Sequence, residues 1–306
     1  MSFKLTILGC NSAIPIPGRN PTSQVLSVDN QLFLIDCGEG TQKELIKNNI
    51  KHQRISHIFI SHLHGDHYFG LIGLLTTMHL MGRQKEVHIY AHKELKTIID
   101  LQLSTSNTEL RYPLFFHSIP INDKKVLFED NNLIISSLVL EHRIACSGFL
   151  FRQKKGYKNI IKEKLKDYNI PINEIMKIRG GSDFQLEDGT IIPNSKLTIP
   201  SQTLNSYCYC SDTKYVDSNI NSIKDVTVLY HETTFMKDLQ EKANITGHST
   251  TLDAANMAIN SHVKVLIIGH YSSRYRDLDK LLLETKKYFS NTYLALDGTT
   301  FDFDLI

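Results

Sequence analysis

The segment that most constrains this chain covers residues 61–67, where three histidines and one aspartate fall within six positions. Imidazole and carboxylate groups are the ligands that zinc and related transition metals commonly use in proteins. Residues 55–60 form a short, largely apolar and β-branched run directly before the segment, so we expect a buried strand there. The sequence therefore predicts a metal site at the end of a strand, built from His62, His64, Asp66 and His67.

The spacing within the cluster indicates how its side chains are presented. His62 and His64 are two residues apart, so on extended backbone they point the same way. Gly65 permits unusual backbone angles, and we expect Asp66 and His67 on a turn that precedes the next helix. A histidine-rich polar loop or a structural zinc site is the alternative interpretation. Against it, one segment supplies four potential ligands, and a second loop bearing a carboxylate would close the site.

Length and composition are compatible with one large α/β domain. The chain has 306 residues, which is long for a single domain but allows one domain with an insertion. Hydrophobic residues make up 41% and charged residues 22%, as in ordinary soluble proteins. The net charge is only +2, so the overall charge does not indicate a class of partner.

The five cysteines and the apolar segments indicate the compartment. Five is an odd number and the spacing matches no disulfide framework, so we expect a reducing environment. We expect Cys208 and Cys210 to be buried as small apolar side chains, with metal binding as the alternative. The N-terminus lacks the pattern of a signal peptide, and the longest apolar stretch, residues 70–82, is too short to span a bilayer. The sequence thus predicts a cytoplasmic protein without a membrane partner.

The pattern of apolar residues predicts a layered fold. Two strand-rich halves, each with helices, indicate two sheets packed face to face with helices outside. We expect strands at residues 3–8, 24–28, 31–36, 57–60, 87–91, 114–119, 133–140, 206–210, 226–230 and 263–268. We expect helices at residues 42–49, 69–81, 95–103, 252–261 and 277–289.

Three later polar residues stand directly after expected strands: His142, Asp212 and His270. Strand ends that meet at one edge of a layered fold are where sites are usually assembled. Alone, each of these residues would be weak evidence, but together with the cluster they give seven candidate ligands. Seven ligands are too many for one tetrahedral ion and fit two ions that share a carboxylate.

A pair of metal ions predicts hydrolytic chemistry. Such a pair lowers the pKa of a shared water from about 15.7 towards about 7 and holds both the attacking and the leaving oxygen of an in-line displacement at phosphorus. We therefore expect the hydrolysis of a phosphodiester.

One segment is strongly basic. Residues 152–179 carry nine lysines and arginines against three acidic residues, a local net charge of +6. An apolar stripe predicts a short amphipathic helix within it. The segment is either a solvated, lysine-rich surface helix or an inserted arm that contacts nucleic-acid backbone. Its aromatic residues are Tyr157 and Tyr168 alone, so we do not expect it to read bases.

The ligand set resembles that of the metallo-β-lactamase superfamily and, more narrowly, the ribonuclease Z family of endonucleases that trim tRNA precursors at their 3′ side. Further segments support the resemblance. Residues 33–42 are similar to the family's acidic glycine turn, and residues 231–235 to its His-Glu-Ala-Thr box, with Thr233 in place of alanine. Residues 247–250 and 270–275 are similar to two further family motifs, Gly-His-Ser-Thr and His-Phe-Ser-x-Arg-Tyr.

The resemblance implies a fold and a set of metal ligands. The fold is α/β, a four-layer αββα sandwich that forms one domain over residues 1–306, with an inserted basic arm at about 152–180. Each subunit would bind two zinc ions, with manganese or another divalent metal as alternatives. One ion would be held by His62, His64 and His142, the other by Asp66, His67 and His270, with Asp212 bridging them.

The resemblance also implies catalytic and binding roles. Asp66 would orient or deprotonate the attacking water. His248, polarised by Glu232, would give a proton to the departing 3′ oxygen, and Arg274 would bind phosphate. The arm would bind tRNA through basic side chains, namely Arg152, Lys154, Lys155, Lys158 and Lys162. The length matches the short form of the family, which implies a homodimer that cleaves precursor tRNA and leaves a 3′-hydroxyl on it.

Two other classes of function remain as alternatives. A general phosphodiesterase, an arylsulfatase-like enzyme or a thioesterase on the same scaffold would share the metal cluster. Such enzymes would not need the basic arm, His248 or Arg274. A non-catalytic RNA-binding protein with this fold would be expected to have lost ligands, whereas all seven are present in the sequence.

Overall fold

The computed structural model describes residues 3–154, 158–199 and 204–306. The chain divides into two compact units. The main unit comprises residues 1–128, 135–151 and 206–306, and the inserted unit comprises residues 129–134 and 152–205. Across the described residues, no helix combines the length and the apolar character that a bilayer crossing requires.

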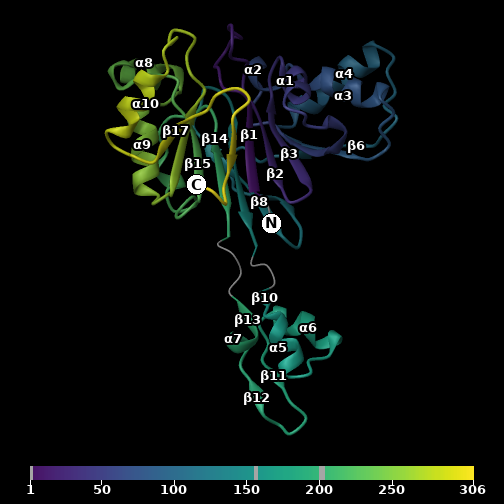
Figure 1. The fold of residues 1–306 in the computed structure, drawn as a ribbon. Coiled ribbons are helices and arrows are strands. Elements are labelled where there is room, and N and C mark those ends of the chain that lie inside the picture. The colour runs from purple at the N-terminus through teal and green to yellow at the C-terminus, as the bar shows by residue number, and fades with distance from the viewer. Residues whose placement is uncertain (1–2, 155–157, 200–203) are drawn as a thin grey trace. The chain divides into compact units, whose positions relative to one another are not determined.

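Two seven-stranded sheets run through the described residues and form the centre of the main unit (Figure 1). In spatial order the first sheet consists of β18 (Thr300–Asp302), β1 (Phe3–Gly9), β2 (Ser23–Val28), β3 (Gln31–Cys37), β4 (Ile55–Phe59), β5 (Val87–Ala91) and β6 (Leu114–Ser118). The second consists of β17 (Thr292–Leu294), β16 (Val265–Gly269), β15 (Val228–Glu232), β14 (Ser206–Cys210), β9 (Cys146–Gln153), β8 (Leu133–Leu140) and β7 (Val126–Glu129).

Parallel pairing explains the continuous apolar runs of several strands. β3, β4, β5 and β6 pair in parallel, as do β14, β15, β16 and β17. Parallel strands are covered on both faces, so they lack a polar alternation. The expected strands at residues 87–91, 133–140 and 206–210 are confirmed to the residue as β5, β8 and β14. Cys208 and Cys210 on β14 are buried, as expected.

Helices cover the outer faces of both sheets (Figure 1). Beside the first sheet lie α1 (Thr41–Lys47), the 3₁₀ turn η1 (His52–Arg54), α2 (Gly65–Tyr68), α3 (Leu71–Leu80) and α4 (Glu94–Thr105). Beside the second lie η2 (Asp217–Asn219), η3 (Lys237–Leu239), α8 (Gln240–Thr246), α9 (Thr251–Asn260) and α10 (Asp279–Lys286). One detail differs from the sequence prediction: Asp66 and His67 lie on the single helical turn α2 and not on an irregular turn.

Aromatic side chains hold the two sheets together. Phe33 and Phe59 on the first sheet contact Phe149 and Phe151 on β9, with ring centroids 5.4–5.9 Å apart. All four side chains are fully buried. A second apolar layer, which includes Leu34, Ile58, Leu74 and Met78, joins the first sheet to its helices. The expected αββα sandwich is therefore confirmed.

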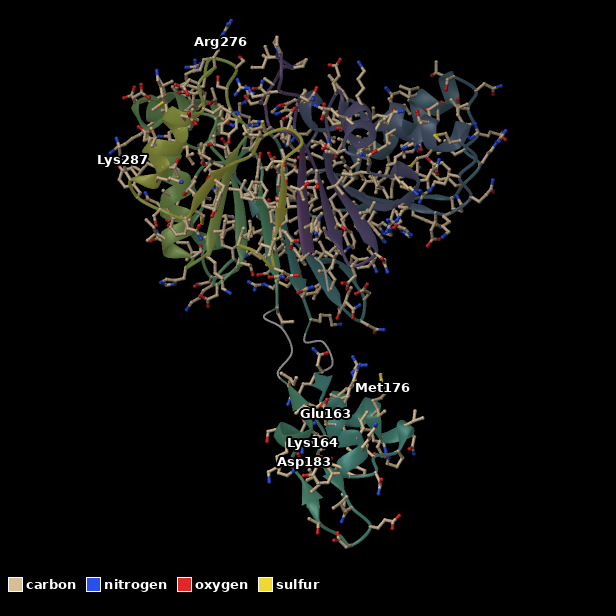
Figure 2. The ribbon with its side chains drawn as sticks, viewed as in Figure 1. Glu163, Lys164, Met176, Asp183, Arg276 and Lys287 are labelled. Carbon is tan, nitrogen blue, oxygen red and sulfur yellow. The ribbon has the colours of Figure 1, made fainter. Side chains whose placement is uncertain are left out.

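The inserted unit has a small core of its own, formed by Ile170, Ile178, Ile192 and Leu197. Its elements are β10 (Asn159–Ile160), α5 (Lys162–Asp167), α6 (Ile172–Arg179), β11 (Phe184–Gln185), β12 (Ile191–Ile192), α7 (Asn194–Leu197) and β13 (Thr198–Ile199). β10 pairs with β13, so residues beyond 180 complete the unit even though the basic run ends there. Glu163, Asp183 and Met176 lie exposed on its surface (Figure 2). The expected short helix is confirmed as α5.

The aromatic layer between the sheets predicts a large effect of one core substitution. Phe151→Ala should lower the free energy of unfolding by about 3–5 kcal/mol, because it leaves a cavity among three rings. Phe115→Ala is the matched control, since that ring is 45% exposed, and it should cost less than about 1 kcal/mol. Urea denaturation of both variants measures the difference, and equal losses would contradict this account of the core.

Candidate metal centre and active site

The seven expected ligands lie together at one edge of the sandwich, where strands of both sheets end. His62 and His64 follow β4, and Asp66 and His67 lie on α2 directly afterwards. The other three follow strands of the second sheet: His142 follows β8, Asp212 follows β14 and His270 follows β16. Strand ends from the two sheets therefore bring together residues that are up to about two hundred positions apart in the sequence.

The first group of candidate ligands consists of His62, His64, His142 and Asp212. Their ligand atoms all lie within 4.8 Å of one another. His64 Nδ1 lies 3.0 Å from His62 Nε2 and 3.2 Å from His142 Nε2. Asp212 Oδ2 lies 3.6 Å from His62 Nε2. Three imidazoles and one carboxylate thus face one point, which is the donor set of a tetrahedral metal site.

The second group consists of Asp66, His67 and His270, whose ligand atoms also lie within 4.8 Å of one another. Asp66 Oδ2 lies 3.5 Å from His67 Nε2 and 3.6 Å from His270 Nε2. The other oxygen of Asp212, Oδ1, lies 3.1 Å from His270 Nε2 and 3.4 Å from His67 Nε2. One carboxylate therefore turns one oxygen towards each group, which is the arrangement that bridging requires.

Two buried nitrogens test whether these residues fit metal ions. His67 Nε2 and His270 Nε2 are buried, and neither has a hydrogen-bond partner among the described residues. A buried polar atom without a partner is costly and rare in native proteins. Both atoms point at the carboxylate oxygens of the second group, so a cation there would supply the missing interaction. The donor set fits metal ions.

Asp36 orients one of the ligands. Its buried carboxylate accepts a hydrogen bond from His67 Nδ1 at 2.7 Å, which leaves Nε2 of that ring to face the second group. The same carboxylate accepts from Ser61 N at 2.7 Å, from Ser61 Oγ at 2.9 Å and from the Tyr209 hydroxyl at 2.6 Å. Tyr209 belongs to the second sheet, so Asp36 links both sheets to the ligand cluster.

Hydrogen bonds at Nδ1 fix two further ligands. His142 Nδ1 donates to the Gly247 carbonyl at 2.6 Å. His270 Nδ1 donates to Thr234 Oγ1 at 2.9 Å, and that hydroxyl donates to Glu232 Oε2 at 2.6 Å. Each of these imidazoles therefore keeps Nε2 for a metal ion, which is how ligand histidines are usually oriented.

The backbone around His248 is fixed by two helix ends. Gly247 ends α8 in the left-handed conformation, with φ 72°, and a Cβ there would lie 2.9 Å from His142 Nδ1. Thr250 begins α9 with a capping box, in which Thr250 and Asp253 exchange hydrogen bonds. The Gly-His-Ser-Thr motif is thus a tight connection that holds His248 between two helices.

Glu232 and His248 form a buried ion pair beside the ligands. Glu232 Oε1 accepts from His248 Nδ1 at 2.7 Å, and it also accepts from Thr213 N at 3.0 Å. Burial lowers the pKa of His248, but the facing carboxylate raises it more strongly, to about 9. At neutral pH this imidazole is therefore protonated. Since Nδ1 faces Glu232, the Nε2–H bond is the one that remains for a substrate.

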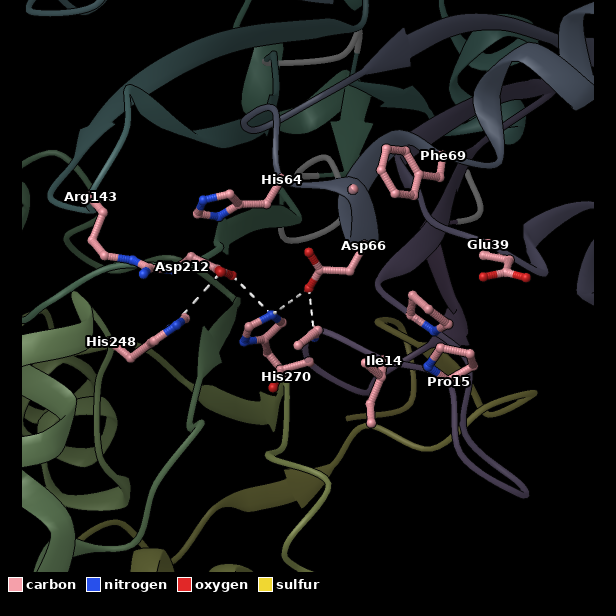
Figure 3. Close-up of a pocket in the computed structure, with 14 residues that line it drawn as sticks. Ile14, Pro15, Glu39, His64, Asp66, Phe69, Arg143, Asp212, His248 and His270 are labelled. Atoms are coloured by element: carbon pink, nitrogen blue, oxygen red, sulfur yellow. Dashed lines mark hydrogen bonds and ion pairs between the residues drawn. The ribbon is translucent and has the colours of Figure 1, made fainter.

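A cavity of about 470 Å³ opens beside the cluster (Figure 3). Asp66 lies at its centre, and its Oδ2 accepts a hydrogen bond from the Ala13 backbone at 2.7 Å. The cavity is lined by Ser12, Ala13, Ile14, Pro15, Pro21, Glu39, His64, Gly65, Asp66, Phe69, Arg143, Asp212, His248 and His270. Candidate ligands and the candidate acid thus share one cavity.

Arg274 does not line this cavity. Its Nε donates to Ser272 Oγ at 3.0 Å, and its guanidinium lies 5.1 Å from the centre of the Phe235 ring. The phosphate-binding role expected for Arg274 remains a prediction.

The expected arm residues belong to the inserted unit, except that Lys155 lies outside the described residues. The described ones are Arg152, Lys154, Lys158 and Lys162. Lys154 Nζ pairs with Glu129 Oε1 at 2.6 Å, and Lys158 Nζ donates to Asn194 Oδ1 at 2.7 Å. Lys162 is exposed.

Sequence reasoning missed three residues of the site. Asp36 stood in a glycine-bracketed turn that could equally be an ordinary strand-to-helix connection. Thr234 was recognised only as part of a motif, and Arg143 was not considered. For Arg143 the available signal was its position directly after His142, a candidate metal ligand.

The sandwich defines a hydrolase with the metallo-β-lactamase fold, and the histidines and aspartates at its edge could bind metal ions. The structure is similar to the crystal structure of human tRNase Z, short form (ELAC1), with a TM-score of 0.72, 26% identity and coverage of 97% of this chain and 98% of that chain. It is also similar in fold to YhfI from Bacillus subtilis, with a TM-score of 0.68, 17% identity and coverage of 99% and 100%.

Sequence comparison identifies the family. Ribonuclease Z of Bacteroides thetaiotaomicron is 42% identical over 97% of this chain and 94% of its own length. Ribonuclease Z of Porphyromonas gingivalis is 38% identical over 98% and 99%. A family model described as anti-Pycsar protein Apyc1 matches residues 3–159, so the first half of the chain also falls within that family. The chain belongs to the ribonuclease Z family, and the predicted family, fold and endoribonuclease class are confirmed.

The hydrogen bond from His67 to Asp36 predicts an effect on metal binding. Asp36→Asn should weaken the binding of a divalent metal by about 10- to 100-fold, because the His67 ring is no longer held with Nε2 towards the second group. Metal titration against a chromogenic chelator measures the affinity. Asp29→Asn is the matched control, since Asp29 has the same left-handed backbone, and it should leave affinity unchanged. An Asp36 variant that folds and binds metal normally would contradict the orienting role.

Proposed function

We propose that this enzyme removes the 3′ trailer from tRNA precursors by hydrolysing one phosphodiester and leaving a 3′-hydroxyl on the tRNA. The observation that carries the proposal is the buried His248–Glu232 pair beside two groups of candidate metal ligands, in a chain that matches ribonuclease Z relatives over nearly its whole length. A general phosphodiesterase is the second candidate, because the cavity itself would also admit a small diester.

We propose two divalent ions per subunit, zinc in the first instance, with manganese as an alternative. His62, His64 and His142 would hold one ion, Asp66, His67 and His270 the other, and Asp212 would bridge them. When bound, such ions lower the pKa of water and stabilise negative charge on a phosphate. The two oxygens of Asp212, one towards each group, support this assignment.

Asp66 would act on the attacking water. Its carboxylate lines the cavity, and the Ala13 N–H fixes its position by donating to Oδ2. A carboxylate held in this way can accept a hydrogen bond from water and take its proton as the water attacks. The loop that carries Ala13 thereby joins the catalytic site.

His248 would act on the leaving group. Its Nδ1 is held by Glu232, so the proton on Nε2 is the one that it can give to the departing 3′ oxygen. The hydrogen-bond chain from His248 through Glu232 and Thr234 to His270 fixes the acid relative to the metal ligands. Proton transfer by a positioned acid contributes typically about 10²- to 10⁴-fold to a rate.

Basic side chains outside the cavity would bind the rest of the tRNA. We assign Arg274 and the arm at about residues 152–180 to phosphate contacts, including Arg152, Lys154, Lys155, Lys158 and Lys162. The net charge of +6 on residues 152–179 supports this assignment, since contacts to nucleic-acid backbone are largely electrostatic.

We also propose that the enzyme is a cytoplasmic homodimer. The exposed apolar side chains of Ile46 on α1, Leu80 at the end of α3, and Met81 support a subunit interface, because such side chains favour burial against a partner. They are 62%, 72% and 62% exposed. The five cysteines form no disulfide among the described residues, which supports a reducing compartment.

Cleavage assays test the function directly. Zinc- or manganese-loaded enzyme should cut a precursor tRNA next to the discriminator base and leave a 3′-hydroxyl on the tRNA. Mapping of the products on precursors with and without an encoded CCA end locates the cut. An enzyme that hydrolyses a small diester but leaves the precursor intact would favour the general phosphodiesterase.

The position of His248 predicts a leaving-group effect. His248→Ala should lower kcat on a normal precursor by about 10²- to 10⁴-fold. A precursor with sulfur in place of the departing 3′ oxygen needs little protonation, so the variant should recover most of that loss. His262→Ala, at an exposed position, is the control and should behave as wild type. An equal loss of kcat on the normal precursor and on the sulfur-containing precursor would contradict the role of His248 as the acid.

The basic arm predicts a dependence on salt. Replacing Lys162 and Lys166, which are both exposed, by alanine should weaken precursor cleavage and flatten the slope of log kcat/KM against log salt by roughly 0.7–0.9 per lost phosphate contact. Hydrolysis of a small diester should not change. Lys280→Ala with Lys287→Ala on the main unit is the matched control. Equal effects of the two double variants would argue against the arm.

A further inference from the structure

Arg143 is a basic side chain in the active-site cavity to which the proposed mechanism gives no role. Of the fourteen residues that line the cavity, it alone is a lysine or arginine. The residue lies in the connection between β8 and β9 and is exposed. Within the described part of the chain, its guanidinium forms no hydrogen bond or ion pair. This cation therefore faces the substrate side of the cavity with its donors available.

Hydrogen bonds hold the backbone next to Arg143, whereas its guanidinium has no such partner among the described residues. Glu141 N donates to Thr213 Oγ1 at 3.0 Å, and the Glu141 carbonyl accepts from Lys214 N at 2.9 Å. His142, the next residue, is held through the Gly247 carbonyl. Arg143 thus starts from a backbone that is anchored to two neighbouring segments, so little reorganisation is needed to direct its guanidinium.

The cavity has two chemically different sides. Figure 3 shows Arg143 on the side of Asp212 and His248, whereas Phe69, Ile14 and Glu39 lie on the opposite side. Phe69 and Ile14 are 63% and 53% exposed, and Glu39 is exposed as well, so that opposite side offers an anion two apolar side chains and one carboxylate. An anion is therefore favoured on the side of Arg143.

The direction of the reaction identifies which anion this is. His248 would give its proton to the departing 3′ oxygen. That oxygen belongs to the tRNA body, so the retained tRNA strand must lie on the side of His248. An RNA strand carries one phosphate per linkage, and the scissile phosphate faces the ligand groups. The next phosphate along the retained strand is then the one that lies on the side of Arg143.

We propose that Arg143 binds the phosphate of the linkage immediately 5′ of the scissile one, in the retained tRNA strand. This inference rests on the proposed function. The planar guanidinium can donate two parallel hydrogen bonds to such a phosphate, and it would set the register of the strand. Arg274 is differently placed, since it lies against Phe235 and Ser272 outside the cavity.

The first experiment compares two substrates. Arg143→Ala should lower kcat/KM for a precursor tRNA by about 10- to 100-fold, while hydrolysis of bis(p-nitrophenyl) phosphate, which has a single phosphate, stays within about twofold of wild type. Arg143→Lys should recover part of the loss, because it keeps the charge but not the planar fork. Arg111→Ala, at an exposed arginine that does not line the cavity, is the matched control and should have no effect.

The second experiment removes the charge from the phosphate instead. A precursor with one neutral methylphosphonate at the linkage 5′ of the cleavage site should be cut about 10- to 100-fold more slowly by the wild type, and Arg143→Ala should suffer no additional loss. An equal further loss in both enzymes, or an equal loss of the small diester with Arg143→Ala, would overturn the assignment. A wild type that never cuts the unmodified precursor would overturn the proposed function, and this inference with it.

Discussion

The buried carboxylate of Asp36 is the interaction on which the rest of the site depends. It is fully buried, and it accepts hydrogen bonds from His67, from the backbone and side chain of Ser61, and from Tyr209. A charge without water is tolerated only when such donors surround it. The donors come from the ends of β4 and β14 and from α2, so Asp36 is satisfied in the arrangement in which the two sheets stack here. That arrangement is the one that brings the ligands together.

Two further carboxylates of the site are buried among groups that can donate hydrogen bonds. Asp212 and Glu232 are also buried carboxylates, and each faces imidazole nitrogens. Glu232 holds the proton of His248 in place, whereas Asp212 has one oxygen towards each ligand group. The fold therefore places carboxylates beside the candidate metal-binding nitrogens and beside the imidazole of His248. The buried carboxylates thus both stabilise this edge of the sandwich and position the candidate ligands and the candidate acid.

Much of this could be predicted from the sequence because local patterns carried it. The cluster of His62, His64, Asp66 and His67 lies within one short segment, and short runs rich in apolar and aromatic residues located β5, β8 and β14 to the residue. The role of Asp36 could not be predicted, because Tyr209 is 173 positions away and meets it only when the sheets stack. The inserted unit extends to residue 205, beyond the predicted end at about residue 180, and the reason is different. Its later strands are two residues long and follow the end of the basic run, so neither periodicity nor charge revealed them.

We infer that Asp212 joins two metal-binding groups into one site, with one oxygen towards each group. Anomalous diffraction at the zinc edge, on crystals of the zinc-loaded protein, tests it most directly. We predict two anomalous peaks per subunit, one beside His62, His64 and His142 and the other beside Asp66, His67 and His270, with Asp212 between them. A single peak, or a second peak away from Asp212, would contradict the account.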